Sequence, residues 1–389
     1  MNREFCIAGP ERYAVRGLDG IETPRLLLFD WALRANRQKL KAVSDGFRQL
    51  RLMAKTCKAS AVLEEYHRNG LDMMKASSVR EARVIAQSTG IADILIAFPL
   101  YGPAVEGFRR LQRELPEKRF SVVVPNRACA RELSDGADNE VDVFLDLDPG
   151  MKRMGVAFGR PAVELAGEIT ALPRLRLVGV HVYDGQIHMA NAEALARHSD
   201  RLMAAIDGTI RALGDGHAIR EVVTSSSLTA ESNLAAHRSA GYPWRHTVSP
   251  GTAVLWDSGY NDVMPGAFEY AAAVATRVVD VREHRDTHVL TTDCGHKMGA
   301  STDQGPVHVL SVRGYQAFGA SELFGRLVWI GLDRETGEPL EGDPQAMLGR
   351  VVLVFPQHVC PTVNQYSFAL RVRDGDVAEQ VAIDARDGG

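Results

Sequence analysis

The sequence predicts an α/β protein made of a (β/α)8 TIM barrel followed by a mainly antiparallel β domain. Eight short apolar segments alternate with helix-like segments between residues 51 and 253, which is the pattern of a parallel sheet covered by helices. Eight is the number of strands that closes such a barrel. After residue 265 the β-rich segments follow one another without long helices between them, which indicates a second domain. An open doubly wound sheet is the alternative, but no GxGxxG follows an early strand.

The expected elements divide the chain into three parts: a leader at residues 1–22 packing on the β domain, the barrel at 23–265 and the β domain at 266–389. Barrel strands are expected at residues 51–55, 71–76, 94–98, 121–125, 141–148, 177–185, 221–227 and 245–253. Helical apolar spacing predicts helices at residues 31–50, 78–88, 105–115 and 192–213. Further strands are expected at residues 24–30, 271–282, 287–292, 307–312, 350–355 and 367–372.

Composition and charge exclude several classes of protein. A net charge of -4 gives no basic surplus for binding nucleic acid or an anionic membrane. No apolar run reaches the roughly 18 residues of a membrane span, and the N-terminus lacks the pattern of a signal peptide. The five cysteines are odd in number and form no CxxC pair, which argues against a disulfide framework. We expect a cytoplasmic protein that acts on a small molecule.

Lys55 lies at the end of the first barrel strand, in RLMAKTCK. Barrel enzymes carry their chemistry at this end of the strands. A lysine amine placed there can form a Schiff base with a carbonyl cofactor when its surroundings favour the neutral form. Taken alone, a lysine at a strand end is more often a solvated rim residue.

Two hydroxyl-rich loops follow the seventh and eighth barrel strands, where barrel enzymes often bind phosphate. The loops are TSSSLT at residues 224–229 and SPGT at residues 249–252. Their candidate phosphate ligands are Ser226, Ser227, Thr229, Ser249, Gly251 and Thr252. Either loop alone would be an ordinary turn. Together with Lys55 they indicate a phosphorylated carbonyl cofactor, and pyridoxal 5'-phosphate fits.

Two further side chains follow the fifth and sixth strands. Arg153, in DPGMKRMGV, is placed to hold an oxyanion, either the phenolate of the cofactor or a substrate carboxylate. The alternative is a surface ion pair. Tyr183, in VYDGQIH, shares one face of its strand with His181 by the period of two. That face points either inward, where Tyr183 would lie against a flat ring, or outward under a helix.

His358 and Cys360 form a candidate metal pair in FPQHVCPTVN. Side chains two apart point the same way in an extended chain. An imidazole and a thiolate make half of a zinc site and leave positions for water and substrate. The alternative is a buried cysteine next to an incidental histidine.

Eight ordered motifs resemble the D-threonine aldolase and D-serine dehydratase family, relatives of alanine racemase with the fold-type III pyridoxal phosphate architecture. The motifs are TPRLLLFDWALRANRQKL, MAKTCK, ADILIAFPLYGP, DLDPGMKRMGV, VYDGQIH, SPGTAVLWDSGY, DCGHK and HVCPTVN, and the resemblance covers roughly residues 22–386. It implies that Lys55 is the Schiff-base lysine, that Arg153 faces the phenolic oxygen and that Tyr183 packs on the ring. It implies phosphate binding at residues 225–229 and 251–252, and a homodimer.

For His358 and Cys360 the resemblance implies a divalent metal, zinc first, with manganese or magnesium as alternatives. The implied activity is a metal-assisted lyase for D-3-hydroxy amino acids, by retro-aldol cleavage or by dehydration. Other enzymatic interpretations are a racemase, an epimerase or a carbon–carbon bond-forming enzyme on the same scaffold, and a pyridoxal phosphate carrier without turnover is a third class.

The chain departs from the family at Met53 and Cys57, which stand where histidines are common. Leu323 and Phe324 stand where the family has a glutamate and a histidine, and Ser249 replaces the arginine of alanine racemases.

Overall fold

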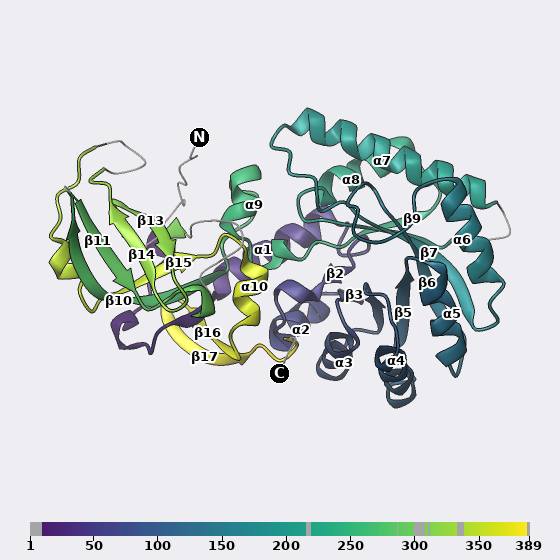
Figure 1. The fold of residues 1–389 in the computed structure, drawn as a ribbon, viewed down its shortest axis with the longest axis horizontal. Helices are drawn as coiled ribbons and strands as arrows, with labels where there is room; N and C mark the ends of the chain where they lie inside the picture. Colours follow the sequence, from purple (N-terminus) through teal and green to yellow (C-terminus); the bar gives the residue numbers. More distant parts are fainter. Residues whose placement is uncertain are drawn as a thin grey trace. The chain divides into compact units, whose positions relative to one another are not determined.

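The computed structural model describes residues 10–214, 219–285, 287–298, 308–309, 312–332 and 338–386 (Figure 1). The chain forms two compact units. The barrel unit contains residues 39–55 and 60–251, and the β unit contains the described residues up to Gln38 together with Thr56–Ala59 and Thr252–Arg386. None of the described helices is long and apolar enough to cross a membrane.

The barrel unit is built on a parallel sheet of eight strands, as the sequence predicts. The strands are β2 (Leu52–Met53), β3 (Met73–Ala76), β4 (Asp93–Ile96), β5 (Arg119–Val124), β6 (Val141–Leu147), β7 (Leu175–Tyr183), β8 (Glu221–Ser225) and β9 (Arg245–Val248). Each pairs with the next in chain order. The N–H of Arg51 donates to the Val248 carbonyl at 2.9 Å and the N–H of Met53 to the Pro250 carbonyl at 3.1 Å. These two bonds join the first strand to the last, so the barrel closes.

Helices cover the outside of the barrel strands (Figure 1). They are α2 (Ser60–Arg68), α3 (Val79–Ser88), α4 (Pro103–Glu114), α5 (Arg127–Gly136), α6 (Arg160–Thr170), α7 (Ala192–Leu213) and α8 (Ala230–Ala240). Local sequence sets several of their starts. The Oγ of Ser78 accepts from the Glu81 N–H at the start of α3, and the Oδ1 of Asn126 accepts from the Cys129 N–H at the start of α5.

Buried apolar side chains pack together in the interior of the barrel. Leu95, Val123, Phe144, Val178 and Val223 form one buried apolar cluster. A Cβ on Gly179 would come within 2.3 Å of the Phe144 ring, so the close approach at this point of β7 requires glycine.

A buried ion cluster lies toward the N-terminal ends of the strands. Arg51 is 1% exposed, and its guanidinium lies 2.8 Å from the Glu221 carboxylate and 2.7 Å from the Asp93 carboxylate. Features at this end of a barrel serve stability rather than chemistry. We therefore expect the functional side chains at the opposite end of the barrel, where the strands finish.

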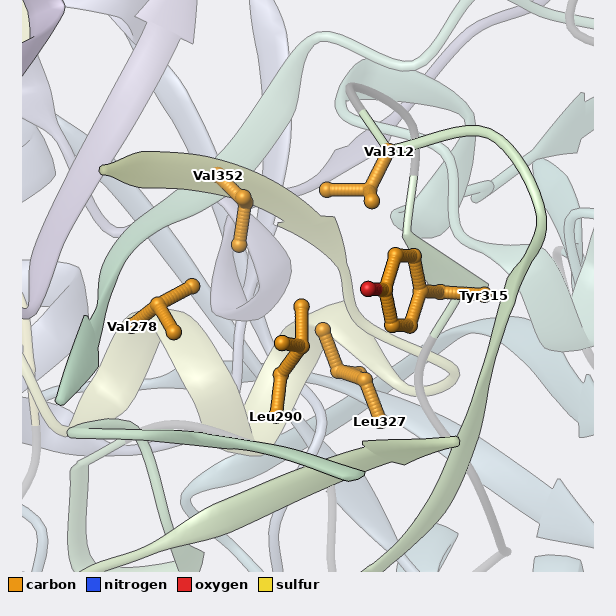
Figure 2. Packing of buried hydrophobic residues seen from close by; sticks show 6 residues of the cluster. All are labelled: Val278, Leu290, Val312, Tyr315, Leu327 and Val352. Carbon is orange, nitrogen blue, oxygen red and sulfur yellow. The ribbon is translucent and has the colours of Figure 1, made fainter. Parts of the chain in front are cut away.

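The β unit has a sheet of nine strands that is antiparallel apart from one pair. Its strands are β1 (Arg25–Phe29), β10 (Ala272–His284), β11 (Thr287–Thr292), β12 (His308–Val309), β13 (Tyr315–Ala320), β14 (Gly325–Trp329), β15 (Val351–Phe355), β16 (Phe368–Arg373) and β17 (Asp376–Ala382). The main path runs β13-β14-β11-β10-β1-β16-β17, and β15 pairs with β10 and β12. Figure 2 shows the side chains that fill one of its cores, Val278, Leu290, Val312, Tyr315, Leu327 and Val352. The described part of this unit also includes the short helices α9 (Ser258–Val263) and α10 (Val359–Asn364).

The first strand of the chain belongs to the β unit, whereas the expected boundary at residue 23 places it with the barrel. β1 pairs antiparallel with β10 and parallel with β16, which comes from the far end of the chain. Helix α1 (Asp30–Val43) then leads to the barrel. Tyr13, before β1, packs its ring against Phe29 and Phe355, with centroids 5.0 and 5.2 Å away. The strand's position depends on partners roughly 250 and 340 residues away, which local patterning does not identify.

Candidate active site

Lys55 lies where the first barrel strand ends. The strand β2 is only two residues long and passes into a single 3-10 turn at Ala54–Thr56 that carries the lysine. Lys55 is half-buried, and it makes no hydrogen bond or ion pair with any other described residue. Lys58, three residues later, is 4% exposed. Of these two amines, that of Lys55 is the one open to a ligand from the barrel end.

A second lysine lies inside the barrel, and sequence reasoning did not select it. The Nζ of Lys75 lies 3.3 Å from the Nε2 of His181, and the Nδ1 of His181 lies 2.6 Å from the Oδ1 of Asp146. Because Lys75 is on β3 and His181 is on β7, this contact crosses the interior. The face of β7 that carries His181 is therefore the inward one, which decides between the two orientations left open by its period.

Burial shifts the pKa values of the two basic side chains in this cluster, Lys75 and His181. Burial lowers the pKa of the Lys75 amine well below its ordinary value, and the positive charge of Lys55 lowers it further, while the Asp146 carboxylate acts in the opposite direction. Burial likewise lowers the pKa of His181. Two sequence signals could have pointed to Lys75 and Asp146: a lysine within the apolar segment MMKA, and the alternation of VDVFLDLD.

Arg153 and Tyr183, two of the candidate site residues, lie in contact with each other. The guanidinium carbon of Arg153 lies 4.6 Å from the centroid of the Tyr183 ring. Arg153 is exposed and forms no ion pair within the described residues, so the alternative of a surface ion pair is not what the structure has. The loop is shaped by Asp148, whose carboxylate accepts from the N–H groups of Gly150 and Lys152.

The two expected phosphate loops come together. The N–H of Gly251 donates to the Oγ of Ser227 at 3.1 Å, which ties the loop after β9 to the loop after β8. Ser249 is 3% exposed, and its Oγ is a buried polar atom without a hydrogen-bond partner in the described structure. A buried hydroxyl of this kind is expected to have a partner, so it points to a ligand.

The remaining loop residues serve the loop itself. The Oγ of Ser226 accepts from the Leu228 N–H at 3.2 Å. The Thr229 hydroxyl donates to the Oδ1 of Asp184 at 2.9 Å, so its hydrogen is used inside the protein. Thr252 opens a short 3-10 turn in the β unit, where its carbonyl accepts from the Trp256 N–H.

Asp184 is a buried carboxylate that sequence reasoning also missed. Besides the Thr229 hydroxyl it accepts from the Nδ2 of Asn233 on α8 at 3.3 Å, and the Nε2 of His198 on α7 lies 3.5 Å away. These contacts fasten the end of β7 to the start of α8. Asp184 therefore holds the loop at residues 224–229 in place.

The candidate metal pair has a different backbone from the one expected. His358 is the N-cap of α10 and Cys360 lies in its first turn, so the argument from an extended chain is wrong. The Sγ of Cys360 lies 3.1 Å from the Oγ1 of Thr56. No group of three or more His, Cys, Asp or Glu side chains suited to a metal occurs among the residues described. Leu323 and Phe324 are 50% and 46% exposed.

Asp257 contacts the same helix. Its Oδ2 accepts from the Val359 N–H at 3.1 Å, and its Oδ1 caps α9 by accepting from the Tyr260 N–H at 2.9 Å. Burial raises the pKa of Asp257 to about 6. This carboxylate links the starts of α9 and α10.

Comparison with known proteins relates both units of the chain to known domains. Residues 31–258 match the family described as alanine racemase, N-terminal domain, and residues 271–372 match the putative serine dehydratase domain. The chain is 25% identical to a 3-hydroxy-D-aspartate aldolase of Paracoccus denitrificans (strain Pd 1222), over 97% of this chain and 95% of that one. It is 26% identical to a D-threonine aldolase of Arthrobacter sp., over 94% and 93% of the two chains.

Solved structures agree with this relationship. The D-threonine aldolase of Filomicrobium marinum superposes with a TM-score of 0.80 and 26% identity, over 95% of this chain and 96% of that one. The D-threo-3-hydroxyaspartate dehydratase of Delftia sp. HT23 gives a TM-score of 0.76 at 21% identity, over 94% and 98% of the two chains. The latter likeness concerns the fold.

Proposed function

We propose that this chain, which belongs to the alanine racemase N-terminal domain family, is a pyridoxal phosphate-dependent lyase that acts on D-3-hydroxy amino acids. The observation that carries the proposal is the Lys55 amine, half-buried at the end of β2 and without an ion pair among the described residues. Relatives that cover almost the whole chain are named for aldol cleavage of such amino acids.

The residues present fit the cofactor. Lys55 supplies the amine that would bind it covalently, and Arg153 a guanidinium for its phenolic oxygen. Tyr183 offers a ring face beside that guanidinium. When bound, pyridoxal phosphate supplies an electron sink for the charge that develops at the substrate Cα.

The phosphate is assigned to the paired loops. Ser249 contributes a buried hydroxyl with no protein partner in the described structure, and Ser227 and Gly251 hold the two loops together. Neither loop contains a lysine or arginine, so neutral hydroxyl and backbone donors would hold the phosphate. Ser226, Thr229 and Thr252 complete the proposed set, with Thr229 acting through its backbone because its hydroxyl binds Asp184.

A divalent metal on His358 and Cys360 is a separate part of the proposal. A thiolate favours zinc over magnesium, with manganese as a further alternative. Two side chains are half of a tetrahedral shell, and the described residues add no third ligand. The pair alone does not fit a complete site, and the roles given above to Lys55, Arg153 and Tyr183 do not depend on the ion.

Two reactions share these groups. Retro-aldol cleavage releases an aldehyde and glycine, and dehydration releases a keto acid and ammonia. The relatives named above include both aldolases and a dehydratase. The homodimer and the cytoplasmic location that the resemblance and the composition predict remain part of the proposal.

The proposal is tested on protein purified with pyridoxal phosphate. Borohydride reduction followed by peptide mass spectrometry should place the cofactor on Lys55. D-Threonine, D-serine and both D-3-hydroxyaspartates are then assayed for aldehyde, keto acid and ammonia, with the L-enantiomers as controls. Lys55→Ala should abolish turnover, and Lys152→Met, a change to an exposed lysine of the Arg153 loop, should not. Label on Lys58, or no product from any D-3-hydroxy amino acid, contradicts the proposal.

A further inference from the structure

A chain of three buried polar side chains crosses the interior of the barrel unit. Lys75 on β3 and His181 on β7 are four strands apart in the closed order of eight, so they lie on opposite sides. Asp146 is the direct register partner of His181 on β6. Lys75 is 4% exposed, His181 3% and Asp146 3%. Water therefore has little access to this chain, and its members satisfy one another.

The direction of the hydrogen bonds follows from the chemistry of the groups. A carboxylate only accepts, so the Nδ1 of His181 carries the proton and donates to Asp146 over 2.6 Å. The Nε2 of the neutral imidazole then accepts from the Lys75 amine over 3.3 Å. A neutral amine that donates in this way still has a lone pair that can take up a proton.

The backbone of Lys75 lies beside the strand that leads to Lys55. Met53 is the register partner of Lys75, and Lys55 follows Met53 by two residues. The charged groups that act on Lys75 include Lys55, Asp146, Arg153 and Arg51, and of these four Lys55 has the largest effect. Burial and the positive charge of Lys55 both lower the pKa of Lys75, so both favour the neutral form of the Lys75 amine.

We propose that Lys75 is the acid–base partner of the Lys55 amine, held in position by His181 and Asp146. This inference rests on the proposed function, in which Lys55 bonds to a carbonyl carbon. An ammonium group cannot attack a carbonyl, and the carbonyl oxygen cannot leave without a proton. One amine that takes up a proton and returns it serves both needs.

The proton and electron pairs balance over the step. The Lys55 ammonium gives one proton to the Lys75 amine, and the freed nitrogen pair forms a bond to the carbonyl carbon. A second proton moves from that nitrogen to the oxygen. The Lys75 ammonium then protonates the hydroxyl, which leaves as water while the nitrogen pair forms the C=N bond. Lys75 ends neutral, and the product is a protonated imine on Lys55.

The experiment uses cofactor-free full-length protein and pyridine-4-carbaldehyde, an aromatic aldehyde without a phosphate. The initial rate of attachment at Lys55 is measured across neutral to alkaline pH by cyanoborohydride trapping and peptide mass spectrometry. Lys75→Met removes the amine. Lys75→Arg keeps a donor for His181 but cannot give up its proton. Lys118→Met is the matched control, because the Lys118 Nζ donates to the Thr89 and Ile91 carbonyls in the segment between α3 and β4.

Both Lys75 variants should slow attachment by about 100-fold at neutral pH, with a changed pH profile, and Lys118→Met should match the wild type. Attachment at the wild-type rate in Lys75→Arg would show that Lys75 has only a structural role, and would overturn the inference. No attachment at Lys55 in the wild type would instead overturn the proposed function, and the inference with it.

A second measurement does not require the Lys75 variants to fold. The Lys75 amine is titrated by NMR of its Nζ in wild type, Lys55→Met and Asp146→Asn. Removal of the Lys55 charge should raise the pKa of Lys75, and removal of the Asp146 charge should lower it. An unchanged Lys75 titration in Lys55→Met would show that the two amines are not coupled and would overturn the inference.

Discussion

The backbone N–H of Gly251 donates to the Oγ of Ser227 over 3.1 Å, and this bond joins the loops that follow the last two barrel strands. Ser249, two residues before Gly251, has a buried Oγ with no hydrogen-bond partner in the described structure. The Gly251–Ser227 bond therefore fixes the two loops to each other, while the neighbouring Ser249 hydroxyl can donate to a ligand.

Ser249→Ala should weaken pyridoxal phosphate binding by about tenfold, which corresponds to about 1.4 kcal/mol, without lowering thermal stability. The hydroxyl has no protein partner to lose, so its removal acts only on the ligand. Spectrophotometric titration and thermal melts of the cofactor-free protein measure the two effects. Ser78→Ala is the control, because it removes the cap of α3 and should lower stability without affecting cofactor binding. Unchanged cofactor binding together with lower thermal stability in Ser249→Ala would contradict the assignment of the phosphate to this loop.

Cys360→Ser should lower the zinc content of the purified protein and leave cofactor attachment at Lys55 intact. The thiolate is the softer of the two candidate ligands, and a serine hydroxyl binds zinc poorly. Elemental analysis gives the metal content, and chelator followed by zinc tests activity. Cys129→Ala, which changes a buried cysteine of the barrel unit, should retain the wild-type metal content. If wild-type protein purified in zinc buffer holds no metal and turns over equally well in chelator, the metal part of the proposal is wrong.

Arg51→Met should destabilise the protein by about 3–5 kcal/mol, because the buried Glu221 carboxylate loses its ion pair with Arg51 and Asp93 keeps the longer pair with Arg119. Arg48→Met is the control. Arg48 pairs with Asp45 on the surface, where such a pair contributes at most about 1 kcal/mol. Urea unfolding of both variants measures the difference. Equal, small losses would mean that the ion cluster in the barrel is relaxed by water or by proton uptake.

Stability should fall on acidification because of His246. Burial lowers the pKa of this imidazole to about 3 in the folded protein, while an unfolded histidine has a pKa of about 6.5. Between these values the unfolded chain binds the proton and the folded protein does not, so stability rises with pH across this window and is lost as pH falls through it. From pH 7 to about pH 5 the loss from this residue is about 2 kcal/mol.

His246→Gln removes the titration and can still bond to the Thr224 hydroxyl, which His246 Nε2 contacts at 2.9 Å. Urea unfolding at the two pH values should therefore show a smaller acid loss for the variant than for the wild type. Parallel losses in both proteins would assign the acid sensitivity to other groups.

Much of the architecture could be predicted from local pattern. Alternating apolar segments and helical spacing predict eight parallel strands closed into a barrel and a β-rich second part, and both are present. Strand ends also place Lys55 and the loops at residues 224–229 and 249–252 at one end of the barrel, because parallel strands all finish there. The short strand β2 shows that the period locates the element but not its exact length.

By itself, then, the sequence determined the two-part fold, the candidate Schiff-base lysine and the family resemblance that the comparisons confirm. Only the tertiary structure decided that β1 lies in the β sheet, that His181 faces the interior, that Cys360 lies in a helix and that Lys75 reaches His181 across the barrel. A period of two tells which side chains share a face, but not which face is inward. That choice, and the partners of a buried charge, depend on strands far apart in the chain.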